Sequence, residues 1–229
     1  MAQIPLPLRL DVHARFDTFV AGKNRGVLEH LLGIGGGQQA QVLWIWGPPG
    51  SGKSHLLQAV CASANDLGRP AIYLPMKSPG LPGPALLDGL ETLDLVAIDD
   101  IEQIGGGVDW DRSLFALYNE LLAQGACLLM TAPQPPGAIT FSLPDLASRA
   151  AGAVVYRLTP LGEDDTITAL KGHAHHRGLE LPDASADYLM THVERNMVAL
   201  CGWLDTLDMA SLVAQRRLTV PFIRDVLKA

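Results

Sequence analysis

The segment that most constrains the fold of this chain is a glycine-rich octapeptide between two apolar segments. It runs from Gly47 to Ser54 and matches the pattern G-x-x-x-x-G-K-S at every position. The apolar run Val42 to Trp46 before it predicts a buried strand, and His55 to Ala64 after it predicts a helix. A turn of this kind exposes backbone N–H groups that, together with the helix N-terminus, attract polyphosphates. The sequence therefore predicts a phosphate-binding loop.

Each residue of this loop is a candidate contact to a nucleotide. Lys53 is expected to reach the β- and γ-phosphates, and the Ser54 hydroxyl is expected to bind Mg²⁺. The alternative, a glycine-rich turn with a chance Gly-Lys-Ser, is disfavoured by the flanking strand and helix. The candidate nucleotide contacts here are Gly47, Pro48, Pro49, Gly50, Ser51, Gly52, Lys53, Ser54 and His55.

A second apolar run ends in two carboxylates, as the other half of such a site requires. Leu95 to Asp99 predicts a strand, and Asp100 follows it directly. Asp99 is expected to hold Mg²⁺, directly or through water, and Asp100 to orient or deprotonate an attacking water. Strands that end in acidic residues are common, so Asp99 and Asp100 indicate a nucleotide site only in combination with the loop that begins at Gly47. The expected cofactors are ADP or ATP with Mg²⁺.

Strands and helices alternate through the first two thirds of the chain, which predicts an α/β fold. A parallel sheet of five strands covered on both faces follows from this order. The expected strands are Val42 to Trp46, Ala71 to Leu74, Leu95 to Asp99, Ala126 to Thr131 and Ala153 to Leu158. Helices are expected to start near Lys53, Pro84, Asp111 and Pro144, with the glycine-rich stretches Gly33 to Gly37 and Gly105 to Gly107 as loops.

Beyond Pro160 the pattern contains only helices, which predicts a separate helical domain. The segments are Glu163 to Arg177, Asp183 to Arg195, Met197 to Gln215 and Val220 to Leu227. Thr159 to Gly162 is the expected hinge. We therefore expect an N-terminal segment at residues 1–15, an α/β nucleotide-binding domain at 16–160 and a helical domain at 161–229.

Composition narrows the class of partners and the cellular compartment. The net charge is −7, and no basic run offsets it, so direct binding to DNA is not expected. Cys61, Cys127 and Cys201 form no C-x-x-C pair and lie in apolar surroundings, which indicates reduced core thiols in a cytoplasmic protein. Neither a signal peptide nor an uninterrupted apolar run of 18 residues is found, so no membrane contact is expected.

Further motifs resemble the AAA+ ATPases and, within them, the bacterial replication initiator DnaA and its Hda relatives. Phe16 to Asn24 is similar to the segment that packs beside the adenine in DnaA, which makes Val20 a candidate base contact. The other matching segments are Ile98 to Glu102, Leu117 to Asn119, Leu143 to Arg149, Gly178 to Pro182 and Ala214 to Phe222. The resemblance implies an AAA+ domain with a C-terminal all-helical lid. No segment matches the DNA-reading helix-turn-helix of DnaA, so DNA is expected to be contacted at most indirectly.

The N-terminus resembles the hexapeptide with which Hda proteins bind the DNA polymerase III sliding clamp. Gln3 would make polar contacts, and Ile4, Leu6 and Leu8 would provide apolar ones. Prolines between them hold the segment extended and lower the entropy lost on docking. From composition alone, a frayed terminus or a strap over the core is an equal alternative.

The resemblance also assigns roles to side chains far from the loop. Arg149 matches the arginine finger that Hda proteins present to a neighbouring subunit, where a guanidinium neutralises charge on the transferred phosphate. Thr131 keeps a sensor 1 threonine, but Pro133 replaces the aspartate expected there. Val198 replaces the sensor 2 arginine, and Arg195 lies one turn away. These changes argue against efficient hydrolysis and leave nucleotide binding intact.

The function that the resemblance implies is negative regulation of replication initiation. A nucleotide-bound protein tethered to the clamp would stimulate hydrolysis of the ATP bound to DnaA. Two alternatives stay open: a binding module with another partner, and an ATPase or helicase-loader type that hydrolyses its own ATP with Asp100. A homo-oligomer is compatible with each. The remaining polar groups were interpreted as solvated surface: His173, His175 and His176 on the lid, and Asp109, Asp111 and Glu120 on a helix.

Overall fold

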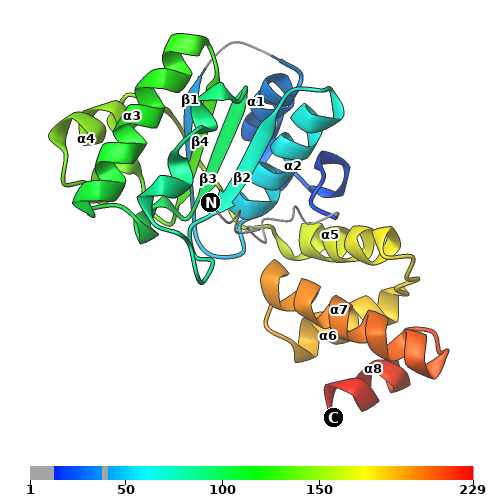
Figure 1. Ribbon diagram of the computed structural model, residues 1–229. Helices are drawn as coiled ribbons and strands as arrows, with labels where there is room; N and C mark the ends of the chain where they lie inside the picture. Colours follow the sequence, from blue (N-terminus) through cyan, green and yellow to red (C-terminus); the bar gives the residue numbers. More distant parts are fainter. Residues whose placement is uncertain (1–12, 38–40, 229) are drawn as a thin grey trace.

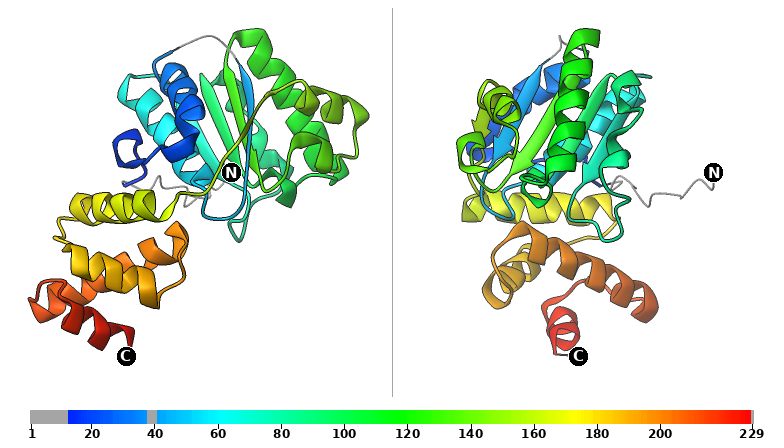
Figure 2. Two further views of the ribbon diagram at one scale, coloured as in Figure 1. Left: turned by 180° about the vertical axis from the view of Figure 1, so that it is seen from behind. Right: turned by 60° about the vertical axis from the view of Figure 1, so that its left-hand side comes forward.

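The computed structural model describes residues 13–37 and 41–228, which form two parts (Figure 1). The first is an α/β domain, and the second consists of four helices. Residues 158–162 join them. The helical domain lies against one end of the α/β domain, as the views from behind and from the side agree (Figure 2).

The α/β domain is built on a parallel sheet of five strands in the order β2-β3-β4-β1-β5. β1 (Val42–Trp46) pairs with β4 (Cys127–Ala132) and with the edge strand β5 (Val154–Arg157). β3 (Leu95–Asp99) pairs with β4 and with β2 (Ala71–Pro75). This confirms the predicted five-stranded parallel sheet. Since parallel strands end at the same edge, the loops after β1, β3 and β4 meet there, which is where ligands bind in open α/β sheets.

Helices cover both faces of the sheet (Figure 1). α1 (Arg25–Gly35) and α2 (Lys53–Asp66) lie on one face, and α3 (Val108–Gln124) and α4 (Pro144–Ala151) lie on the other. Successive side chains of a strand point to opposite faces, so each strand supplies both cores. The central strand β1 illustrates this with Leu43 and Ile45 in the α1–α2 core and Val42 and Trp44 in the α3 core.

α1 corrects the expectation that Gly33 to Gly37 is a loop. The helix continues through this stretch as far as Gly35, which is buried. A Cβ atom on Gly35 would lie 2.9 Å from the Ser63 hydroxyl of α2, so a side chain there would force the two helices apart. The glycines therefore allow close helix packing, which a local pattern cannot distinguish from a loop.

The helix expected near Pro84 is also wrong. The segment forms two 3₁₀ turns, Pro84–Leu87 and Leu90–Thr92. Gly83 and Gly89 have φ values of +88° and +83°, a left-handed conformation that interrupts helical geometry on both sides of the first turn. α3 begins at Val108, three residues before the expected start.

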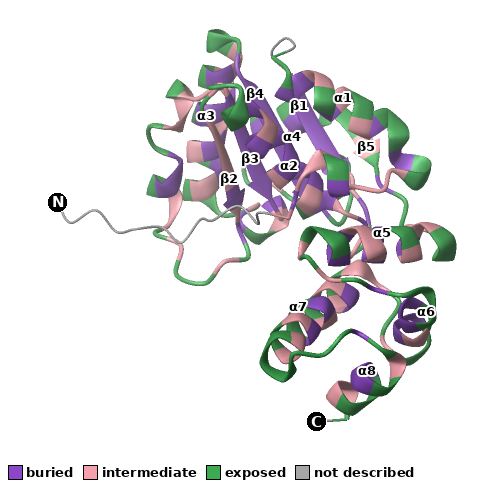
Figure 3. Ribbon diagram, turned by 90° about the vertical axis from the view of Figure 1, so that its right-hand side faces the viewer, coloured by how far each residue is buried: buried purple, intermediate pink, exposed green. Residues whose placement is uncertain are grey.

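The C-terminal domain contains the four expected helices. They are α5 (Glu163–His176), α6 (Asp183–His192), α7 (Met197–Ala214) and α8 (Val220–Leu227). Their buried faces point toward one another, as the purple segments of Figure 3 show. The core of this domain includes Leu170, Leu189, Leu200, Leu204, Phe222 and Ile223. It is separate from the two cores of the sheet.

α7 is the one helix in the described part of the chain that is long and apolar enough to cross a bilayer, with a mean hydropathy of 1.4. By length and mean hydropathy it qualifies, although Asp205 and Asp208 interrupt its apolar residues. The finding is weak support for a membrane span, because Leu200 and Leu204 of this helix pack into the core of the helical domain.

Candidate nucleotide-binding site

The loop after β1 has a backbone that glycine residues make possible. Gly50 and Gly52 have φ values of +74° and +94°. A Cβ atom on Gly52 would lie 2.7 Å from Cε2 of Phe19, and one on Gly47 would lie 2.8 Å from the carbonyl oxygen of Leu158. Side chains at these positions would therefore push away both the N-terminal segment and the chain that leads to α5.

Lys53 begins α2 and points its amine back into the loop. Nζ donates hydrogen bonds to the carbonyl oxygens of Gly47, at 2.7 Å, and Pro48, at 3.1 Å. Burial lowers the pKa of Lys53, and the carboxylates of Asp100 and Asp99 act in the opposite direction. An amine in this position can exchange carbonyl oxygens for phosphate oxygens and lie close to acidic groups at the same time.

Asp99 lies at the end of β3 with only 2% of its surface exposed. Its carboxylate accepts a hydrogen bond from the Thr131 hydroxyl of β4 and another, at 2.7 Å, from the Tyr73 hydroxyl of β2. Burial, followed by the charge of Asp99, raises the pKa of Tyr73, which keeps the phenol protonated as a donor. Tyr73 also shares a hydrogen bond with Ser54. The predicted magnesium ligands Ser54 and Asp99 are therefore connected through one phenol.

The donor set at this point suits Mg²⁺. A serine hydroxyl and a carboxylate are hard oxygen ligands, and Mg²⁺ takes few such protein ligands beside phosphates and water. Across residues 13–37 and 41–228, no three His, Cys, Asp or Glu side chains gather as an all-protein metal site would require. The arrangement fits a metal that arrives with a nucleotide.

Asp100 lies in the cleft next to this pair, but a lysine engages its carboxylate. Its backbone is left-handed, with φ at +56°, and its N–H donates to the Thr131 hydroxyl at 3.0 Å. Lys77 Nζ lies 2.9 Å from Asp100 Oδ1 and 3.8 Å from Glu102. The hydrogen bond to Asp100 raises the pKa of Lys77. The predicted general base is thus paired with a cation.

A cleft of about 540 Å³ extends from the loop to the helical domain. Both domains contribute to its walls. From the α/β domain come Phe19, Val20, Pro49 to His55, Gln58, Lys77, Asp100 and Pro133; from the helical domain come Ala169, His173, Arg177, Met197, Val198, Cys201 and Asp205. Val20 thus lines the cleft beside the loop, as expected for a base contact.

Both substituted sensor positions, Pro133 and Val198, face this cleft. Val198 is 69% exposed and offers no donor to a phosphate. Arg195, one turn away, does not line the cleft, because its guanidinium donates to the Met190 carbonyl oxygen at 3.0 Å and lies 3.7 Å from Glu163. Among the described residues that line the cleft, the cations are Lys53, Lys77 and Arg177, and Asp205 binds Arg177 at 2.8 Å.

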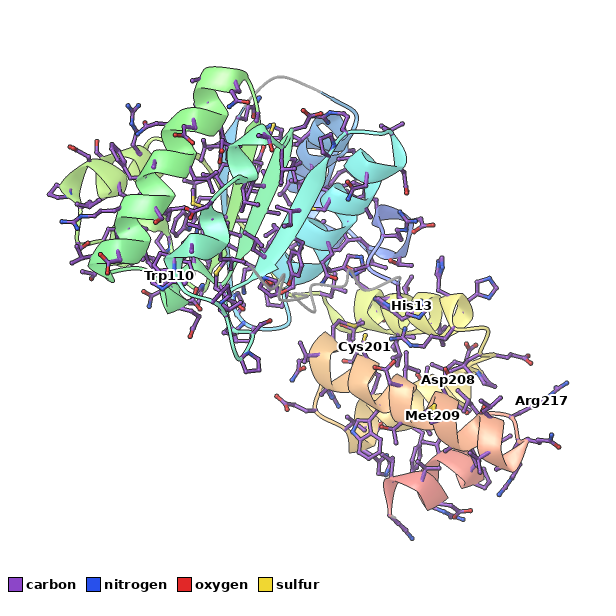
Figure 4. All side chains as sticks on the ribbon, viewed as in Figure 1. His13, Trp110, Cys201, Asp208, Met209 and Arg217 are labelled. Atoms are coloured by element: carbon purple, nitrogen blue, oxygen red, sulfur yellow. The ribbon has the colours of Figure 1, made fainter. Side chains whose placement is uncertain are left out.

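Two predictions about the helical domain are corrected here. His173 was expected on a solvated surface, but only 8% of it is exposed, and its ring lies 5.6 Å from that of His55. Cys201 was expected in a core, but it lines the cleft. Figure 4 shows why: Cys201 lies on the part of α7 nearest the α/β domain, whereas Met209 lies farther along the helix. A thiol can be apolar in sequence context and still face a ligand cleft.

Arg149 does not take part in the cleft. It lies on α4, is exposed, and its Cζ is 5.8 Å from the centre of the Tyr118 ring of α3. The predicted catalytic arginine and the predicted nucleotide site are therefore on different surfaces of the chain. The candidate partner-binding residues Gln3, Ile4, Leu6 and Leu8 lie outside the described residues.

Asp111 is not the solvated residue that the sequence predicted. It is 1% exposed, and its carboxylate accepts hydrogen bonds from the Ser142 N–H, the Ser142 hydroxyl at 2.7 Å and the Gly106 N–H at 3.3 Å. Three donors compensate the burial of this charge. Asp111 thereby ties the start of α3 to the segment that leads into α4.

Sequence reasoning missed Tyr73, Lys77 and His173 as residues of the site. β2 ends beside β3 in the sheet, so a polar side chain in β2 was the signal that could have pointed to Tyr73. No comparable signal exists for Lys77 in a proline- and glycine-rich loop, or for His173, which the helical domain brings to the cleft.

Comparison with known proteins places this geometry in a family context. The Hda lid domain model matches residues 163–227. Domain III of Thermotoga maritima DnaA is 22% identical and aligns over 96% of this chain and 98% of its own, with a TM-score of 0.80. AMPPCP-bound DnaA from Aquifex aeolicus is 21% identical over 89% of this chain and 68% of its own, with a TM-score of 0.70. The Thermotoga maritima RuvB Holliday junction branch migration motor is 15% identical over 89% and 68%, with a TM-score of 0.64.

At these identities the structural likeness establishes the fold. The α/β domain followed by a helical domain is the arrangement that this chain has in common with DnaA domain III and the RuvB motor. The lid itself matches the Hda family, independently of the structural comparison. The chain therefore has the fold of DnaA domain III, and its C-terminal helical domain matches the Hda lid domain model.

Proposed function

We propose that this protein is a nucleotide-bound negative regulator of replication initiation that stimulates hydrolysis of the ATP bound to DnaA. The observation that carries the proposal is the separation of two groups that hydrolysis needs. The cleft is lined by the loop Pro49 to Ser54, and among the described residues that line it the one arginine, Arg177, is paired with Asp205, whereas Arg149 lies outside the cleft. An arginine so placed acts on a nucleotide held by another subunit.

Nucleotide binding is the first part of the proposal. The backbone of Pro49 to Gly52 cradles the phosphates, Lys53 neutralises them, and Ser54 and Asp99 hold the metal. Mg²⁺ bound with the nucleotide neutralises the phosphate charge. AMPPCP is bound in a related DnaA structure, which supports a nucleotide in the same place. We expect ADP to bind at least as well as ATP, because Val198 makes no phosphate contact.

The catalytic part of the proposal assigns one role to Arg149. Its guanidinium enters the ATP site of DnaA and stabilises the negative charge that develops on the γ-phosphate. A group that acts in this way changes the rate and not the binding of nucleotide. The planar fork of arginine can donate two hydrogen bonds to phosphate oxygens, which a lysine ammonium cannot reproduce.

The decisive experiment is single-turnover hydrolysis of ATP preloaded on DnaA, in the presence of sliding clamp and DNA. Arg149→Ala should reduce the stimulated rate by roughly 10³ or more, the value of an arginine finger in related chemistry. Arg149→Lys should recover little of it. Arg112→Ala, which removes an exposed arginine of the neighbouring α3, is the matched control and should keep full activity. Full activity of Arg149→Ala would refute the assignment.

Tethering to the sliding clamp rests on the hexapeptide Gln3 to Leu8. We expect Gln3→Ala with Leu6→Ala to abolish clamp binding in a pull-down. Nucleotide affinity and melting temperature should stay nearly unchanged, because a terminal segment contributes little to the core. A large drop in melting temperature would instead identify the segment as a strap over the fold.

A further inference from the structure

The surface that carries Arg149 is organised by one face of α3. Asp111 and Tyr118 are seven residues apart, about two helical turns, and therefore lie on the same side of the helix. Asp111 binds the backbone and hydroxyl of Ser142, two residues before α4 begins. Tyr118 lies under Arg149, the sixth residue of α4. α3 thus contacts the α4 segment at its base and at its arginine.

The contact between Arg149 and Tyr118 differs from that of most arginines in the chain. Arg177, for example, donates to the Asp205 carboxylate at 2.9 Å, and its charge is thereby neutralised. Within the described parts of the chain, the Arg149 side chain makes no hydrogen bond or ion pair, and its Cζ lies 5.8 Å from the centre of an aromatic ring. A ring face attracts the cation and leaves the N–H donors at its edge free for another acceptor.

The Tyr118 ring is held in place by packing, whereas the Arg149 side chain is open to solvent. Tyr118 is 6% exposed and belongs to the α3 core beside Leu117 and Leu121, so its ring is held in place by the packing of the domain. Arg149 is exposed. A fixed ring beneath a long flexible side chain reduces the number of conformations that the guanidinium samples before it meets its target.

We propose that Tyr118 is a positioning residue for Arg149: its ring holds the guanidinium extended, with its donors free, in the orientation that enters the partner subunit. The inference rests on the proposed function. It adds that the ring, and not the phenol hydroxyl, is the part of Tyr118 that matters, because a cation over a ring contacts the π face.

The first test compares Tyr118→Leu with Tyr118→Phe in the single-turnover assay with DnaA, at several concentrations of this protein. Tyr118→Leu should lower the maximal rate roughly two- to five-fold, the range for loss of an exposed cation–π contact, with the half-saturating concentration unchanged. Tyr118→Phe should restore nearly the full rate. Tyr188→Leu, the same change at a tyrosine of the lid, is the control. A rate increase in Tyr118→Leu, or a loss in Tyr118→Phe equal to that in Tyr118→Leu, would overturn the proposal.

The second test asks whether Tyr118 acts through Arg149. In an Arg149→Ala background, Tyr118→Leu should cause no further loss of rate. An equal additional loss would mean that the tyrosine acts by supporting the fold, and the proposal would be wrong. Failure of the proposed function is seen separately, because Arg149→Ala alone would then be active.

A direct measurement covers the case in which Tyr118→Leu does not fold. In the NMR spectrum of the unaltered protein, the Arg149 Hδ protons should be shifted upfield by the ring current of Tyr118, with Arg149→Lys used for assignment. The shift should persist in Tyr118→Phe. Its absence in the unaltered protein would show that the guanidinium does not rest on the ring, and would overturn the proposal.

Discussion

The nucleotide cleft and the α4 surface around Arg149 differ in how far they are enclosed and in the groups that they present. The cleft is enclosed by two domains, and most of its polar groups are backbone groups of the loop and side chains next to them, such as Lys53 and Ser54. The α4 surface is open and depends on one side chain, Arg149, above one ring. The first region is shaped to enclose a ligand, whereas the second presents one side chain to the outside.

In the proposed function, the cleft binds a nucleotide tightly but hydrolyses it slowly. Pro133 and Val198 line the cleft without a side-chain donor, and the Arg195 guanidinium is engaged by the Met190 carbonyl oxygen and by Glu163. In the proposed function, nucleotide binding and catalysis are assigned to separate surfaces, and a partner completes the second.

Among the changes in the cleft, removal of the Lys53 amine should have the largest effect on nucleotide binding. Lys53→Ala is expected to weaken binding of Mg²⁺–ADP about a hundred-fold or more, because several charge-assisted hydrogen bonds to phosphate are lost. Isothermal titration calorimetry measures this directly. Lys171→Ala, an exposed lysine of the lid, should bind normally. Equal affinity of Lys53→Ala and the unaltered protein would remove the basis for the nucleotide site.

The stability of the α4 segment should depend on the buried Asp111 carboxylate that holds it. Asp111→Ala is expected to lower the free energy of unfolding by about 2–4 kcal/mol, since three donors lose a charged acceptor in a buried place. Chemical denaturation checks the value. Asp109→Ala, two residues away and 82% exposed in its side chain, should change stability by less than about 0.5 kcal/mol. A similar small change in both variants would show that Asp111 does not hold the α4 segment.

An arginine at position 198 of the lid should add a phosphate-binding cation to the cleft. Val198→Arg places a guanidinium in the cleft and is expected to raise affinity for ATP roughly three- to ten-fold relative to ADP, as one added charge-assisted hydrogen bond would. Val213→Arg, at an exposed position farther along the same helix, is the control. An unchanged preference for ADP over ATP would mean that the helix does not bring this position to the phosphates.

The smallest effect is expected from Asp100→Asn on self-turnover. The isolated protein should hydrolyse ATP well below 1 s⁻¹, because the carboxylate is paired with Lys77 and both sensors are altered. Removal of a base that is barely used should then change the steady-state rate little. A rate of about 1–10³ s⁻¹ that Asp100→Asn abolishes would support the self-sufficient ATPase instead.

The sequence predicts the features that depend on residues close together in the chain. Gly47 to Ser54 and Asp99 are recognisable because a strand, a turn and a helix follow one another without interruption, and strand alternation gives the sheet. Asp111 and His173 were misjudged because their partners, Ser142 and His55, are far away in the chain and only packing brings them together. The expected helix at Pro84 failed because left-handed glycines decided the backbone there.

The cleft between the two domains has a thermodynamic consequence. Because its walls come from both sides, with Lys53 on one and Val198 on the other, a nucleotide that fills it must contact both. By linkage, a ligand at a hundred times its dissociation constant adds about 2.7 kcal/mol to stability. Part of that free energy goes into fixing the angle between the lid and the sheet at residues 158–162. The nucleotide concentration of the cell would thus set how rigid the protein is when it meets its partner.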